Sequence, residues 1–173
     1  MSDGIHNDII IREATNEDSQ FILHLIFNIW INEYHFQVKR EDFPDLHEIE
    51  NYYTKTDGLF LVASRNNEIL GTIACSKLSH RCFVLKRMFV NKDYRRLGIA
   101  QALLNKLFDK IVFSKKISNL SLFLSTKESE AIAAKRFYIK NGFRVAPMSA
   151  LPANFPFFYR DDLFMLKDKW DMN

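Results

Sequence analysis

The chain has 173 residues, of which 47% are hydrophobic and 26% are charged, so it can bury the core of one ordinary domain, residues 1–173. Its net charge of +3 is spread along the chain, which predicts no nucleic-acid partner, and its apolar runs are too short to cross a bilayer, which predicts no membrane partner.

Two features bear on the cellular compartment. The N-terminal residues 1–4 are polar and acidic and do not have the character of a signal peptide. Cys75 and Cys82 form no C-x-x-C pair, and we interpret them as buried free thiols. We therefore expect a cytoplasmic protein.

The first third of the chain predicts one strand and two helices. Residues 9–11 have the character of a short strand, and Thr15 with Asp18 has the spacing of a weak capping box for the helix that follows. Apolar residues at helical spacing continue this helix until the polar and aromatic residues 32–36 end it. Asp45 is expected to cap a second, shorter helix.

The middle of the chain predicts neighbouring strands joined by tight turns. Residues 59–64 and 69–78 are rich in β-branched and apolar side chains, and the polar residues 65–68 between them indicate a hairpin. His80 interrupts the pattern, and residues 82–90 form the next expected strand.

The rest of the chain alternates helices with strands. Asn141-Gly142 is a typical stop signal for the second of two amphipathic helices. Hairpins combined with strand–helix crossovers favour a single α/β sheet of mixed direction. The expected elements are a helix over 99–112, a strand over 120–124, a helix over 129–140, and strands over 143–146 and 162–167.

The segment between the strand 82–90 and the helix from residue 99 has the features of an anion-binding turn. The first N–H groups of a helix have no internal partner, and the helix dipole adds partial positive charge there. Gly98 and Ala100 are small enough for a phosphate to approach the backbone, and the basic side chains of Lys92, Arg95 and Arg96 add positive charge. The pattern R-x-x-G-x-A by itself is equally compatible with a purely structural turn.

Two motifs resemble those of the GNAT superfamily of N-acetyltransferases. Residues 85–104 are similar to the strand, turn and helix of its acetyl-CoA motif, and residues 134–143 are similar to its later element A-x-x-F-Y-x-x-x-G-F. The resemblance implies a mixed, mostly antiparallel sheet with splayed central strands, flanked by helices. It also implies acetyl-CoA as co-substrate without a metal, and a monomer or homodimer.

The resemblance also implies roles for single residues. The strand before the turn would bond to the pantetheine arm of the cofactor, and the amides of the turn would bind its pyrophosphate. Tyr138 would lie beside the thioester sulfur and protonate the departing thiolate, the alternative being a packing role for its ring. The cofactor-binding residues implied are Met88, Phe89, Val90, Arg95, Arg96, Leu97, Gly98, Ile99 and Ala100.

Two positions depart from the family pattern. Val84 stands where many members have a Glu that serves as general base, and Ala131 stands where Asn often contacts the cofactor. The general base is therefore open, and without a strand carboxylate an amine of low pKa is easier to acetylate. The remaining candidate bases are Glu33, His35, His47 and His80.

The acceptor pocket is expected where residues 32–36, residues 42–47 and the late loop 147–159 meet. The predicted substrate-binding residues are Glu33, Tyr34 and His35. The acids Glu33, Asp42, Asp45 and Glu48 hint at a cationic acceptor. The late loop holds four aromatic residues and is interpreted either as a lid or as a plug on the core.

The leading function is the transfer of acetyl from acetyl-CoA to a primary amine of a small molecule or peptide. A protein acetyltransferase is the alternative within the same class. A non-catalytic acyl-CoA-binding module is the alternative outside that class, and the absence of a carboxylate at Val84 favours it. Nucleic-acid binding is a distant third.

Overall fold

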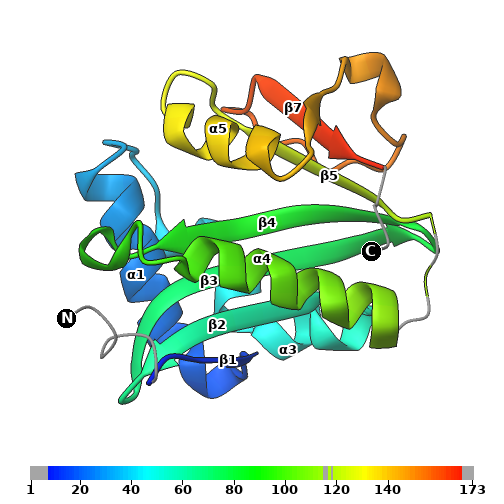
Figure 1. Cartoon of the computed structure of the whole chain (residues 1–173). Helices are drawn as coiled ribbons and strands as arrows, with labels where there is room; N and C mark the ends of the chain where they lie inside the picture. Colours follow the sequence, from blue (N-terminus) through cyan, green and yellow to red (C-terminus); the bar gives the residue numbers. More distant parts are fainter. Residues whose placement is uncertain (1–7, 115–116, 118, 169–173) are drawn as a thin grey trace.

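The computed structural model describes residues 8–114, 117 and 119–168, so the N-terminal residues 1–4 discussed above lie outside it. Seven strands form one sheet in the order β1-β2-β3-β4-β5-β7-β6 (Figure 1). All neighbouring strands are antiparallel except β4 and β5. The strands are β1 Ile10–Glu13, β2 Leu59–Arg65, β3 Glu68–Ser79, β4 Cys82–Val90, β5 Ser121–Thr126, β6 Arg144–Val145 and β7 Leu163–Lys167. The predicted mixed, mostly antiparallel sheet is confirmed.

Helices cover both faces of this sheet. In Figure 1, α4 crosses in front of β2, β3 and β4, while α1 and α3 lie behind them. The helices are α1 Ser19–Asn32, α2 Pro44–His47, α3 Ile49–Tyr52, α4 Ile99–Asp109 and α5 Ile132–Lys140. Single turns of other helix types are η1 Asn16–Asp18, η2 Arg40–Asp42, η3 Thr54–Thr56, η4 Lys92–Tyr94, η5 Lys110–Ser114 and η6 Met148–Ala150.

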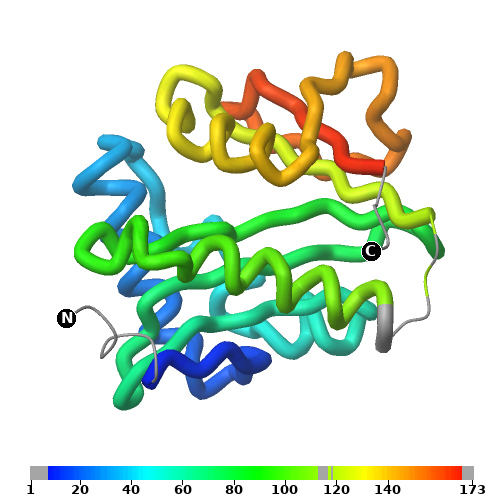
Figure 2. Tube along the Cα trace, in the orientation of Figure 1, coloured from blue at the N-terminus to red at the C-terminus, as the bar shows by residue number. Residues whose placement is uncertain are grey.

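The two faces of the sheet bury separate apolar clusters. Leu103 and Leu107 of α4 and Tyr138 of α5 belong to the cluster on one face. On the other face, α1 and α3 pack against the first half of the sheet. On that same face, the second half of the sheet is covered by Phe155, which belongs to the late loop 147–159. Figure 2 shows the segments after residue 120, in yellow to red, gathered on one side of β4 and the earlier segments on the other.

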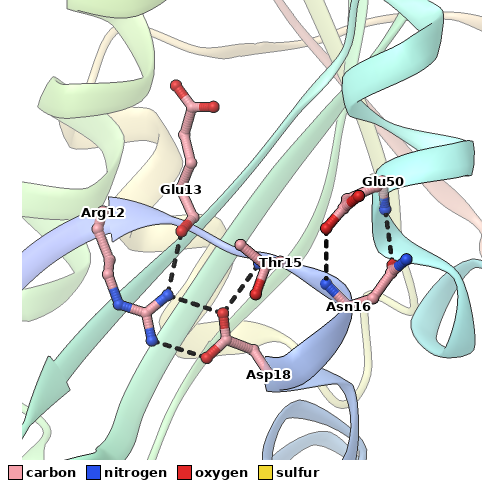
Figure 3. Close-up of polar contacts among 6 residues, drawn as sticks. All are labelled: Arg12, Glu13, Thr15, Asn16, Asp18 and Glu50. Carbon is pink, nitrogen blue, oxygen red and sulfur yellow. Dashed lines mark hydrogen bonds and ion pairs between the residues drawn. The ribbon is translucent and has the colours of Figure 1, made fainter.

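The start of α1 is fixed by the polar contacts drawn in Figure 3. Asp18 accepts the Thr15 N–H at 2.9 Å and two bonds from the Arg12 guanidinium at 2.7 Å each. Asn16 and Glu50 exchange backbone-to-side-chain bonds at 3.2 and 3.1 Å, which tie this turn to α3. The predicted capping box is confirmed, and it caps the single turn η1 that leads into α1.

Two predictions about local structure were wrong in detail. Asp45 does not cap the second helix: Phe43 is the N-cap of α2, and Asp45 lies inside that helix with its side chain buried. The helix predicted over 129–140 begins only at Ile132. The turn before this helix is fixed by a residue distant in the sequence, because the Glu128 N–H donates to the Asp162 carboxylate at 2.8 Å.

Candidate active site

The central strands β4 and β5 separate along their length. They pair only between Cys82–Val84 and Ser121–Phe123. Beyond these residues β4 continues against β3 as far as Val90, and β5 continues against β7 as far as Thr126. The edge of β4 that faces β5 therefore carries backbone N–H and C=O groups without a strand partner after Val84, as the divergence of the two ribbons in Figure 1 shows.

A β-bulge bends β4 where the strands separate. Thr72 of β3 is opposite Phe89 and Ala74 is opposite Lys86, so β4 contains one extra residue here. Arg87 takes up the difference with a left-handed backbone, φ +53°, and its carbonyl accepts the Thr72 hydroxyl at 2.7 Å. A bulge of this kind re-aims the side chains that follow it.

A cavity of about 290 Å³ opens between the separated strands. One wall is the bulged half of β4, and the opposite wall is the end of β5 with the first turns of α5. The end of α1 and the late loop form its remaining sides. The lining residues are 84–89, 124–127, 130, 131, 134 and 138, with Trp30, Tyr34, Phe36, residues 156–158 and Asp161.

Tyr138 lies on the cavity wall, and the residue is 6% exposed. Its hydroxyl has no hydrogen-bond partner among the residues that the structure describes. Burial raises the pKa of Tyr138 far above its usual value, with a further contribution from Tyr34. The phenol is therefore protonated at neutral pH and free to donate a hydrogen bond to a group in the cavity.

The predicted anion-binding turn follows directly from β4. After the turn η4, Arg96 and Gly98 have left-handed backbones, φ +62° and +80°, and α4 begins at Ile99. Within the described residues, the N–H groups from Arg96 to Ala100 donate to no other protein group. Leu97 lies inside this run. The structure thus presents five consecutive free amides at the positive end of an 11-residue helix.

The structure brings only one of the three predicted substrate-binding residues to the cavity. Tyr34 lines the cavity, but Glu33 and His35 do not. Glu33 instead pairs with Arg95 of the turn, and His35 is exposed with φ +55°.

The other candidate bases and the segment 42–47 stay outside the cavity. His47 is exposed, with Nε2 3.2 Å from the Arg40 carbonyl oxygen. His80 is exposed in the turn between β3 and β4. Neither imidazole therefore reaches the cavity wall in this structure.

The late loop combines the two predicted roles. Phe155 is buried against Phe123 and Phe164 and belongs to the core. Phe158 lines the cavity and packs against Phe43 at 6.2 Å between ring centroids. Tyr159 is exposed. The loop is thus anchored as a plug at one end and forms a wall of the cavity at the other.

Sequence reasoning missed a buried ion pair behind the cavity. The Arg87 guanidinium donates from Nε and Nη2 to the two oxygens of Asp45, both at 2.9 Å, and the Tyr53 hydroxyl donates to the same carboxylate at 2.6 Å. Burial alone would raise the pKa of Asp45, but Arg87 outweighs it and the pKa is lowered. The charge of Asp45, one of the acids that hinted at a cationic acceptor, is therefore already compensated by Arg87.

Two further ionisable cavity residues also escaped the sequence analysis. Lys86 lies half-buried in the β4 wall, and burial together with Arg87 lowers its pKa. Asp161 lies half-buried at the end of the late loop, and its pKa is raised mainly by burial. Neither residue stands in a recognisable motif, and only the packing of the loop against β5 brings Asp161 to the cavity.

Neither cysteine is in a disulfide; Cys75 is buried and Cys82 is half-buried. In the described ranges, no helix combines the length and apolar character needed to cross a membrane. The same ranges hold no group of three or more His, Cys, Asp or Glu side chains arranged to hold a metal ion.

Comparison with known proteins gives a consistent result. The profile described as "Acetyltransferase (GNAT) family" matches residues 23–143. A GNAT-family acetyltransferase from Staphylococcus aureus Mu50 is 34% identical, with a TM-score of 0.83 over 92% of this chain and 98% of that one. Comparison with curated protein sequences gives no significant match.

Two more distant structures share the fold. An acetyltransferase from Streptococcus agalactiae 2603 is 23% identical, with a TM-score of 0.84 over 94% of this chain and 99% of that one. The PaiA N-acetyltransferase from Thermoplasma acidophilum, solved in complex with coenzyme A, is 22% identical, with a TM-score of 0.71 over 93% and 99% of the two chains.

Proposed function

Because the chain belongs to the Acetyltransferase (GNAT) family, we propose that it transfers the acetyl group of acetyl-CoA to a primary amine of a small molecule or peptide. The observation that carries this proposal is the path from the cavity between β4 and β5 to the free amides of the turn. The unpaired edge of β4 leads from one to the other.

Acetyl-CoA would lie along this path with its pyrophosphate at the turn and its thioester in the cavity. The pyrophosphate would accept hydrogen bonds from the free amides between Arg96 and Ala100, with the Arg95 guanidinium at the mouth. The pantetheine arm would pair with the edge of β4 over Met88, Phe89 and Val90 that faces β5 and has no strand partner there, as an added strand does. The thioester would then lie in the cavity beside Tyr138.

Tyr138 would act as the general acid. Attack by the amine on the thioester carbonyl expels the thiolate of coenzyme A, which needs a proton. The phenol of Tyr138 is held protonated by burial and has no competing partner among the described residues. It is therefore suited to donate that proton.

The acceptor is proposed to be an amine of low pKa. Making a lysine-type amine neutral at pH 7 costs roughly 4–5 kcal/mol, whereas an α-amine costs only about 1–1.5 kcal/mol. Val84 offers no carboxylate on β4 that could remove the proton. The lower cost of deprotonation therefore favours α-amines as acceptors. We further propose that the protein acts in the cytoplasm as a monomer or homodimer. Neither Cys75 nor Cys82 is in a disulfide, which is compatible with that reducing compartment.

An amine panel tests the proposal. Coenzyme A release from acetyl-CoA is followed with a thiol reagent in the presence of amino-acid amides, peptides with free N-termini and Nα-blocked lysine, each against a reaction without amine. We expect amine-dependent release, faster with α-amines than with ε-amines. Good turnover of ε-amines beside inactivity on α-amines would contradict the preference.

The second candidate is a non-catalytic acyl-CoA-binding module, which Val84 favours because the β4 wall lacks a base. Calorimetric binding of coenzyme A without thiol release for any amine would select the module. Absence of coenzyme A binding would contradict both candidates.

A further inference from the structure

Val84 and the late loop share one face of the sheet. The Val84 side chain belongs to the buried cluster that contains Phe155 of that loop. It also forms part of the cavity wall. A group carried by the late loop can therefore reach the region in which a carboxylate at residue 84 would have acted.

The end of the late loop is fixed to β5 by its backbone. The Asp161 N–H donates to the Phe158 carbonyl at 3.0 Å, which turns the chain. The next N–H, of Asp162, donates to the Thr126 carbonyl at 3.1 Å, which attaches the turn to the last residue of β5. These bonds place the Asp161 carboxylate on the cavity wall.

Only one oxygen of this carboxylate is occupied. The Ser125 hydroxyl donates to Asp161 Oδ2 at 2.5 Å. Oδ1 has no hydrogen-bond partner, and the carboxylate no ion-pair partner, among the described residues. By contrast, Glu33 and Asp45 lie outside the cavity and are both engaged with an arginine. Glu130, the other carboxylate on the cavity wall, is exposed, and no described residue bonds to its side chain and orients it. Asp161 is therefore the cavity carboxylate that is oriented by a neighbour and still able to accept a proton.

We propose that Asp161 is the general base of the acetyl transfer and supplies from the late loop the carboxylate that β4 lacks at Val84. The assignment rests on the proposed function. In the reaction, the nitrogen–carbon bond forms as an amine proton passes to Asp161 Oδ1, and the carbon–sulfur bond breaks as the thiolate takes the Tyr138 proton. Asp161 then releases its proton to solvent, and Tyr138 regains one from solvent, which leaves an amide and a free thiol.

The surroundings of Asp161 suit this role. Burial raises its pKa, and the nearby Asp162 raises it further, while the Ser125 hydrogen bond and the charges of Arg87 and Lys127 oppose the increase. A carboxylate of raised pKa is a stronger base. Lys86 and Glu130 are the other charged groups on the cavity wall.

The decisive variant is Asp161→Asn, which keeps the shape of the side chain and an oxygen for Ser125. We expect kcat/KM for the best amine of the panel to fall about 10²-fold or more. The fall should be larger for amines of high pKa than for amines of low pKa. The dissociation constant of coenzyme A should stay within about twofold of the wild-type value, which also verifies folding.

A matched control and a second variant isolate the proton transfer. Asp162→Asn removes the charge of the neighbouring, exposed carboxylate and keeps the oxygen that accepts the Glu128 N–H, so kcat/KM on the plateau should remain close to wild type. Because Asp162 raises the pKa of Asp161, the acid limb of this variant should move slightly to lower pH. Ser125→Ala removes the hydrogen bond that lowers the pKa of Asp161. The acid limb of its kcat/KM profile should therefore move to higher pH, with little change on the plateau.

The outcomes separate the two proposals. If the wild type acetylates amines but Asp161→Asn keeps its rate and pH profile, Asp161 is not the base and the proposed function stands. An increase in the amine KM alone, with kcat and pH profile unchanged, would make Asp161 a binding group and overturn the assignment. If the wild type binds coenzyme A and acetylates no amine, the proposed function fails and this inference fails with it.

Discussion

Glu33 at the end of α1 and Arg95 at the anion-binding turn form a bidentate ion pair, with Oε2–Nη1 and Oε1–Nη2 distances of 2.7 and 2.9 Å. The two residues are 62 positions apart, and the Arg95 Nε also donates to the Val90 carbonyl at 2.9 Å. The pair therefore connects α1, the end of β4 and the turn. It also occupies both oxygens of a residue that the sequence offered as a base.

The first prediction concerns this pair. Glu33→Gln should leave the shape of the kcat/KM pH profile unchanged, because a carboxylate engaged on both oxygens is not the proton acceptor. The free energy of unfolding should fall by no more than about 1 kcal/mol, since the pair is partly exposed. Loss of the acid limb in this variant would return Glu33 to the mechanism.

The second prediction compares two glycines with the same backbone conformation. Gly98 has φ +80° and Gly142 has φ +83°, so Gly→Ala at either position should cost about 1–2 kcal/mol of stability. A Cβ at Gly98 would point into open space next to the free amides, where the pyrophosphate is proposed to lie. Gly98→Ala should therefore weaken coenzyme A binding about tenfold, equivalent to roughly 1.4 kcal/mol, by calorimetry.

Gly142→Ala is the matched control for this experiment. The three atoms nearest to its Cβ would all belong to the Lys167 side chain, at 3.4 Å or more. It should lose comparable stability and bind coenzyme A as the wild type does. Equal effects of the two substitutions on binding would remove the turn from the cofactor site.

The third prediction concerns the general acid. Tyr138→Phe should lower kcat about 10²-fold or more and leave the affinity for acetyl-CoA nearly unchanged, since only the proton donor is lost. Because burial raises the pKa of Tyr138, the wild-type rate should not decline on the alkaline side through ionisation of this phenol. Tyr52→Phe, on an exposed tyrosine of α3, should be silent. Full turnover by Tyr138→Phe would leave Tyr138 a packing residue.

The fourth prediction concerns the buried pair of Asp45 and Arg87. Asp45→Asn leaves the buried guanidinium without a negatively charged partner and should lower the free energy of unfolding by about 3–5 kcal/mol in denaturant unfolding at pH 7. Because Arg87 lowers the pKa of Asp45 in the native state, this stabilisation is complete above the unfolded value, near pH 4. It disappears as the pH falls through the lower native pKa.

The control for the fourth prediction is Asp168→Asn, which breaks the more exposed pair with Arg144. This substitution should cost only about 0–1 kcal/mol. The stability difference between the wild type and Asp45→Asn should shrink in acid. A difference that stays constant down to pH 2 would show that the native carboxylate is not stabilised by Arg87.

The sequence by itself determined the order of the elements and the position of the turn. Alternating and helical apolar patterns, the capping box of Thr15 and Asp18 and the glycine at residue 98 are local properties, because each depends on residues a few positions apart. The strands 82–90 and 59–64 were predicted to within a residue of their bounds. The separation of the central strands followed from the resemblance to the GNAT superfamily.

Only the tertiary structure decided which side chains face the cavity. Asp45 meets Arg87 across 42 positions, and Ser125 meets Asp161 across 36. Such contacts depend on how α2 and the late loop pack on the sheet, and no periodicity in the sequence encodes them. The same packing placed His47 and His80 outside the cavity and neutralised Glu33. Local patterns fix the backbone, whereas the protonation and partners of ionisable groups depend on long-range burial and charge.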